Sequence, residues 1–153
     1  MRVYLLYILT GLITLWVLLF LFGLSAGFAN YAPILAIVGS VLLFVVASPV
    51  LIWNERIGII IGVISCLLLL PFDIGFTISL FDDGVFNWGT LLGFSPIVGT
   101  IMSLFYSIKA FRVNKLMSMN RGLRIFLFLM PILMFVLYVV FYGKYWSWGI
   151  FKI

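Results

Sequence analysis

Long apolar runs almost free of charge are the feature that most constrains how this chain can fold. Five of them follow one another along 153 residues, and each comes close to the roughly 20 residues that a helix needs to cross a bilayer. Little sequence is left for a soluble domain, so residues 1–153 are expected to form a single transmembrane domain. The five helices are predicted at residues 3–28, 34–53, 57–72, 88–110 and 123–142.

The amino-acid composition supports this interpretation. The chain is 66% apolar and 8% charged, whereas soluble domains are about 45–50% apolar and about 25% charged. The predicted fold class is therefore an all-α integral membrane protein. In a soluble protein the net charge of +5 would suggest nucleic acid. Here the basic residues flank apolar runs, so anionic lipid headgroups are the expected partners and nucleic acid is not.

The end of the third run is open to two interpretations. The helix either ends near residue 72, which places Asp73 in water at the outer interface, or continues to residue 81 and carries Asp73 into the membrane. We favour the interface, because Pro71 permits a break in the helix. A carboxylate inside the membrane usually faces a cavity or a partner. Under either interpretation, Asp73 is the best single candidate for a functional ionisable group.

Small residues recur at about every fourth position in the third and fourth runs. Helices in a bilayer associate largely through close backbone approach, so we expect these two helices to pack against each other along the two stripes. The alternative is a polar path lined by the three serines. The members are Gly58, Gly62 and Cys66 in the third run, and Ser95, Gly99, Ser103 and Ser107 in the fourth.

Few residues of this chain are suited to catalysis or metal binding. Histidine is absent, and Cys66 is the only cysteine, so the commonest general base and metal ligand are missing. Asp82 and Asp83 precede Gly84 in a sequence typical of a turn, and two carboxylates fall short of the six to eight oxygens that Ca²⁺ takes. We expect no enzyme activity, no cofactor and no metal.

Two functions remain open. The first is a non-enzymatic accessory or interaction component of a membrane complex, a class that includes protective, immunity-like proteins. The alternative is a small oligomeric transporter or channel that uses Asp73 and the serine and glycine helix face. The expected partner is a membrane protein or a second copy of the chain. The chain has no Asn-x-Ser/Thr acceptor for glycosylation, which is compatible with a bacterial plasma membrane.

A basic connector between the fourth and fifth runs determines the expected orientation. Five of the nine Lys and Arg residues lie in it, without an acidic residue among them. With five crossings, these five residues share one side of the membrane with Arg2 and Arg56, which leaves only Lys144 and Lys152 on the other side. The positive-inside rule therefore predicts a cytoplasmic N-terminus and an external C-terminus. The five connector residues are Lys109, Arg112, Lys115, Arg121 and Arg124.

This orientation is tested by fusing a reporter enzyme that works only in the cytoplasm after Ile153. Five crossings from a cytoplasmic N-terminus end outside, so the fused reporter should be inactive. Reporter activity at this position would rule the orientation out.

Overall fold

The computed structural model describes residues 1–22, 31–82, 88–111 and 120–142 of the chain. All regular structure in these ranges is helical, so the expectation of an all-α protein built from five apolar helical segments is confirmed. Four segments are long and apolar enough to cross a membrane, and the N-terminal segment is apolar but shorter. The elements are α1 (Arg2–Ile13), the π-helical segment η1 (Thr14–Phe22), α2 (Tyr31–Trp53), α3 (Glu55–Asp82), α4 (Trp88–Gly93), α5 (Ser95–Phe111) and α6 (Arg121–Tyr142).

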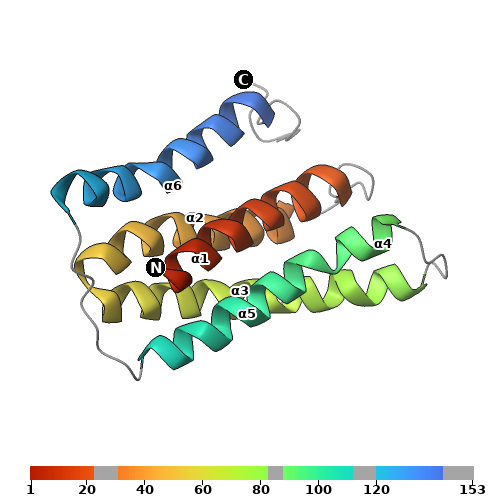
Figure 1. Ribbon diagram of the computed structural model, residues 1–153. Coiled ribbons are helices and arrows are strands. Elements are labelled where there is room, and N and C mark those ends of the chain that lie inside the picture. The colour runs from red at the N-terminus through yellow and green to blue at the C-terminus, as the bar shows by residue number, and fades with distance from the viewer. Residues whose placement is uncertain (23–30, 83–87, 112–119, 143–153) are drawn as a thin grey trace.

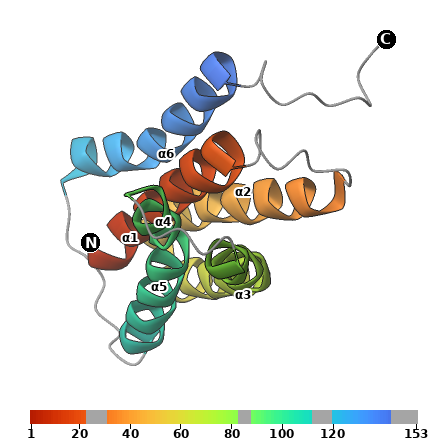
Figure 2. The same cartoon turned by 90° about the vertical axis from the view of Figure 1, so that its right-hand side faces the viewer.

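The helices form three tiers, which Figures 1 and 2 show from two sides. α6 makes the outer tier, α1 and α2 the middle one, and α3 and α5 the third, while α4 lies at the height of the middle tier. The first helix packs against both α2 and α5, and α3 packs against the same two helices. The main contact of α6 is with α2. Two tyrosines add hydrogen bonds between α6 and the N-terminal helix: Tyr4 donates to the Leu127 carbonyl, and Tyr138 donates to the Leu15 carbonyl.

A single residue, Asn54, joins α2 to α3. Its side-chain oxygen accepts a hydrogen bond from the Ile57 backbone N–H at 3.2 Å, and so it caps the first turn of α3. The chain reverses here so tightly that a Cβ added to Gly58 would lie 2.6 Å from the Leu51 backbone nitrogen. Glycine is therefore required at position 58 for the two helices to meet.

The favoured end of the third helix near residue 72 is wrong. α3 runs through Pro71 without a break and ends at Asp82, so Asp73 lies within the helix. Proline removes one backbone hydrogen bond, but unwinding the chain would leave several backbone groups unsatisfied in a lipid environment. Continuing the helix therefore costs less free energy. Pro49 is likewise enclosed in α2, which continues to Trp53.

The predicted fourth helix, at residues 88–110, is bent at Phe94, where α4 gives way to α5. The Phe94 N–H still bonds to the Thr90 carbonyl, and the Val98 N–H to the Phe94 carbonyl, so the segment remains one membrane-length span. Pro96 has no N–H for the carbonyl of Leu92, four residues earlier, which favours a bend here. The Ser95 hydroxyl donates to this carbonyl at 2.6 Å and replaces the missing bond. The first predicted helix also changes, becoming π-helical from Thr14. Its expected last residues, 23–28, lie outside the described part.

Substituting Gly58 tests the close approach of α2 and α3. Gly58→Ala should lower the free energy of unfolding in detergent by about 1–3 kcal/mol, because the new methyl group forces backbone to shift. Gly75→Ala, on the same helix, is the control, since an added Cβ there meets nothing within 4 Å. Equal stability of the two variants in a denaturant titration would contradict the packing at the hairpin.

Candidate functional site: a buried polar interface of three helices

Hydroxyl groups join α1 to α5 through the centre of the bundle. The Tyr7 hydroxyl hydrogen bonds to the Ser107 hydroxyl at 2.6 Å, and the Thr10 hydroxyl to that of Ser103 at 2.8 Å. All four side chains are buried. The Ser107 hydroxyl also donates to the Ser103 carbonyl of its own helix. In a lipid environment such bonds satisfy polar groups that water cannot reach, and so they hold the helices together.

The small-residue stripes do not meet as expected. α3 and α5 do pack against each other, but the stripes receive side chains of other helices. A Cβ added to Gly62 would lie 2.0 Å from the Tyr7 ring, and one added to Gly99 would lie 3.1 Å from the Thr10 hydroxyl. α1 therefore contacts one glycine of each stripe, while Gly58 faces Leu51 of α2. Sequence spacing identified the smooth helix faces, but it could not show which helix would cover them.

The remaining stripe residues have separate environments. Cys66 is fully buried in the hydrophobic core that also contains Tyr7. Ser95 does not join the hydroxyl pairs of Ser103 and Ser107, because its hydroxyl bonds to the carbonyl of Leu92. Ser103 and Ser107 thus bond to α1, whereas Ser95 bonds to the carbonyl that lacks an N–H partner because of Pro96.

Asp73 is the only acidic residue in the interior of a described helix, and it lies against α5. Its Oδ2 accepts a hydrogen bond of 2.6 Å from the Thr100 hydroxyl, and both side chains are 0% exposed. Its Oδ1 has no hydrogen-bond partner among the described residues, and the same holds for the buried Thr14 hydroxyl. One carboxylate oxygen and one hydroxyl are thus buried in this bundle without a described partner.

Sequence reasoning singled out Asp73, Ser103 and Ser107 but missed their partners. Tyr7, Thr10 and Thr14 are spaced by three and four residues, the spacing of one helix face. This spacing was a usable signal, because it repeats in Thr100, Ser103 and Ser107. Without knowing which helices are neighbours, however, two polar helix faces cannot be paired.

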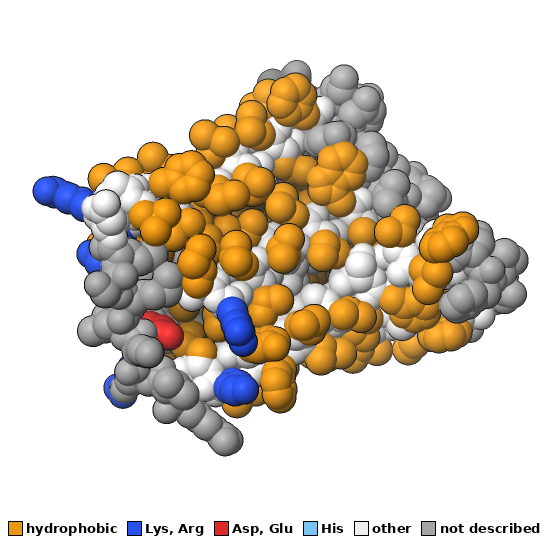
Figure 3. All heavy atoms as spheres, viewed as in Figure 1, with side chains coloured by type: hydrophobic (Ala, Val, Ile, Leu, Met, Phe, Trp, Pro, Cys, Tyr) orange, Lys and Arg blue, Asp and Glu red, His pale blue; other side chains and the backbone are white. Residues whose placement is uncertain are grey.

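The described basic residues gather at one end of the bundle. The N-terminus, the α2–α3 junction and the start of α6 lie together at the left of Figure 1. In Figure 3 the Lys and Arg side chains on the visible face lie toward this end. Lys109 and Arg121 are exposed, and Arg124 is half-buried. Arg112 and Lys115, the other two residues of the predicted basic connector, lie outside the described part of the chain.

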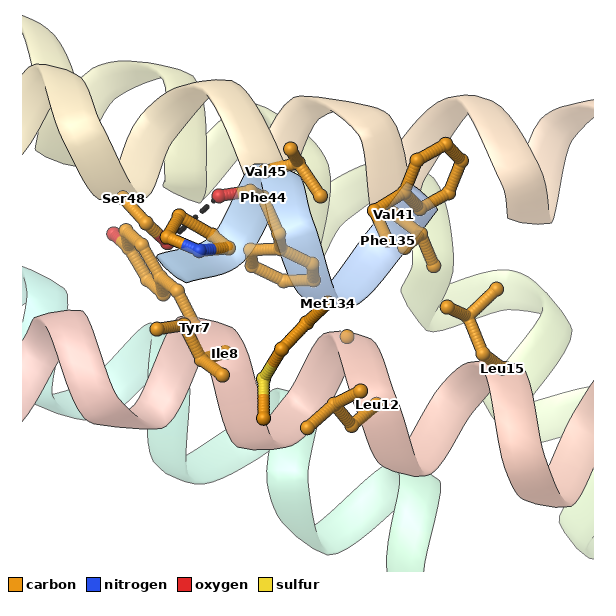
Figure 4. A pocket seen from close by; sticks show the side chains of 12 residues that line it. Tyr7, Ile8, Leu12, Leu15, Val41, Phe44, Val45, Ser48, Met134 and Phe135 are labelled. Carbon is orange, nitrogen blue, oxygen red and sulfur yellow. Dashed lines mark hydrogen bonds between the residues drawn. The ribbon is translucent and has the colours of Figure 1, made fainter. Parts of the chain in front are cut away.

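A pocket between α1, α2 and α6 is almost entirely apolar. Figure 4 shows Met134 and Phe135 reaching into it from α6. The Ser48 hydroxyl at its wall donates to the Phe44 carbonyl at 2.8 Å, and the Tyr7 hydroxyl is bonded to Ser107. The polar groups at this pocket are therefore already bonded within the protein, and the pocket presents apolar surface. The other lining residues are Ile8, Gly11, Leu12, Leu15, Val41, Val45 and Pro131.

Comparison with models of known protein families, with curated proteins and with solved structures finds no match for this chain. The chemistry of the site therefore follows from its geometry. Within the described ranges, no three His, Cys, Asp or Glu residues come together as metal ligands. The interface offers one carboxylate, set among hydroxyl groups.

Proposed function

We propose that this chain is a non-enzymatic, multi-pass component of a membrane complex, as expected from its sequence. The proposal is supported above all by the hydrogen bonds that the buried hydroxyl groups make between helices. Those of Tyr7, Thr10, Ser103 and Ser107 bond helix to helix, which suits a rigid bundle whose outer surface makes the functional contacts. A bacterial plasma membrane as its location belongs to the same proposal.

The outer helix α6 is the proposed contact surface, and a membrane-spanning helix of another protein is the proposed occupant. Only 17% of the membrane-length part of α6 is buried within the bundle, against 44% for α2. Four of its large apolar side chains follow a spacing of three and four residues and are 51–69% exposed: Leu129, Leu133, Val136 and Val140. Such a face fits a helix that docks lengthwise.

A second candidate function is a small oligomeric transporter or channel, and Asp73 favours it. A carboxylate buried within a membrane-length helix is costly and commonly marks an ion or substrate pathway. The two candidates differ in what must accompany the chain: a different protein in the first case, and only further copies in the second.

Purification of the tagged chain in mild detergent tests the proposal. We expect a defined second membrane protein to elute with it in a fixed ratio. Leu133→Trp with Val136→Trp should abolish this association, because the added rings stop a helix from docking on α6. Ile101→Trp with Ile108→Trp, on the exposed face of α5, should leave it intact.

A chain that purifies alone as a monomer would contradict the proposal, and so would a partner retained equally by both tryptophan variants. In both cases the exposed face of α6 would contact lipid and not a partner helix. A homo-oligomer without any second protein would instead support the transporter or channel.

A further inference from the structure

We propose that Asp73, Thr14 and Thr100 form a binding site in the interior of the bundle for one small alkali cation, such as Na⁺. The first observation is that two buried oxygens lack partners among the described residues, Asp73 Oδ1 and Thr14 Oγ1. Both side chains are 0% exposed. Leaving a buried acceptor unsatisfied costs the full desolvation of that group, and a bound cation would remove this cost for both oxygens.

The helix register brings the three residues to one level of the bundle. Tyr7 pairs with Ser107 and Thr10 pairs with Ser103, so α1 and α5 run antiparallel with a fixed register. One turn farther along this interface lie Thr14 on one side and Thr100 on the other. Because the Thr100 hydroxyl is bonded to Asp73, the register places Thr14 at the level of the carboxylate.

The charge of Asp73 needs compensation from within the membrane-length part of the bundle. On α5 the closest basic residue in sequence is Lys109, nine positions after Thr100, or about 13 Å along the helix axis. On the first helix it is Arg2, twelve positions before Thr14, or about 18 Å away. Neither helix brings a basic side chain to the carboxylate. A buried carboxylate is stabilised by a paired opposite charge or by a metal ion, or it takes up a proton and becomes neutral. A cation and a proton therefore compete for Asp73.

The donor set selects a small monovalent ion. Carboxylate and hydroxyl oxygens are hard ligands, which suit alkali and alkaline-earth cations rather than softer metals. A single carboxylate neutralises one positive charge, so a divalent ion would remain undercompensated. Thr100 donates its hydrogen to Asp73 Oδ2, which leaves the lone pairs of its oxygen available to an ion.

The backbone is irregular at one of the three proposed ligands. The first helix becomes π-helical at Thr14, and π-helical turns occur frequently at functional sites. The inference concerns binding alone, and it requires neither of the two functions proposed above.

Chemical modification of Asp73 tests the site in the detergent-solubilised, full-length protein. A hydrophobic carbodiimide adds to a protonated carboxylic acid, and peptide mass spectrometry locates the adduct. At constant pH and ionic strength, replacing choline by Na⁺ should slow modification of Asp73 by at least about tenfold, because the ion displaces the proton that the reagent needs. Li⁺ should protect in the same way.

Removing one ligand should weaken this protection. Thr14→Val and Thr100→Val are each expected to raise the half-protecting Na⁺ concentration by about tenfold, since each removes an oxygen that contacts a charge. Thr77→Val is the matched control on α3. The Thr77 hydroxyl donates to the backbone carbonyl of Asp73, not to its carboxylate. The half-protecting Na⁺ concentration of this variant should therefore equal that of the wild-type protein.

A second measurement decides the matter if the reagent does not reach Asp73. Na⁺ should raise the midpoint of thermal unfolding relative to choline, because it binds only the folded protein, and Asp73→Asn should remove this response. The proposal is overturned if neither modification nor unfolding responds to Na⁺ or Li⁺, which would mean that Asp73 binds a proton only. It is also overturned if Thr14→Val leaves the Na⁺ response unchanged.

Discussion

The need to satisfy buried polar groups without water governs the centre of this bundle. Helices surrounded by lipid gain little from burying apolar surface against each other, so small residues and hydrogen bonds decide how they pair. Here the hydroxyl pairs of α1 and α5 meet that need, with Tyr7 opposite Ser107 and Thr10 opposite Ser103. The glycines allow it: Gly62 makes room for the Tyr7 ring, and Gly99 for Thr10. The N-terminal helix is thereby fixed against α2 and α5, with the Tyr7 ring reaching Gly62 of α3.

The hydrogen bonding of buried polar groups is incomplete at Asp73. The hydroxyl pairs at the α1–α5 interface close within the protein, whereas Asp73 has one bonded and one unbonded oxygen among the described residues. Natural bundles rarely keep such a group without a use for it. Thr14, whose buried hydroxyl also lacks a described partner, begins the π-helical segment. Backbone irregularity and unsatisfied polarity therefore coincide at Thr14.

The fold class could be predicted from the sequence because five apolar runs leave few alternatives in lipid. Two features of the helices could not. The effect of a proline does not follow from its position: the helix bends near Pro96 while α3 passes through Pro71 without interruption, although both prolines lie in apolar runs. Which helix covers a smooth face depends on the arrangement of all five. The spacing predicts that the two stripes face each other, but Gly62 and Gly99 each meet a side chain of α1. Asp73 was recognisable as unusual, but its partner Thr100 was not.

The pairing of α1 with α5 is the central claim, and disulfide cross-linking tests it most directly. In a Cys66→Ala background, Thr10→Cys with Ser103→Cys places two sulfurs where hydroxyl oxygens lie 2.8 Å apart, so mild oxidation should cross-link them readily. Thr10→Cys with Met102→Cys is the control, because Met102 is exposed on another face of α5. We predict rapid cross-linking of the first pair and none of the second. No cross-link at Ser103, or equal cross-linking at Met102, would contradict the account.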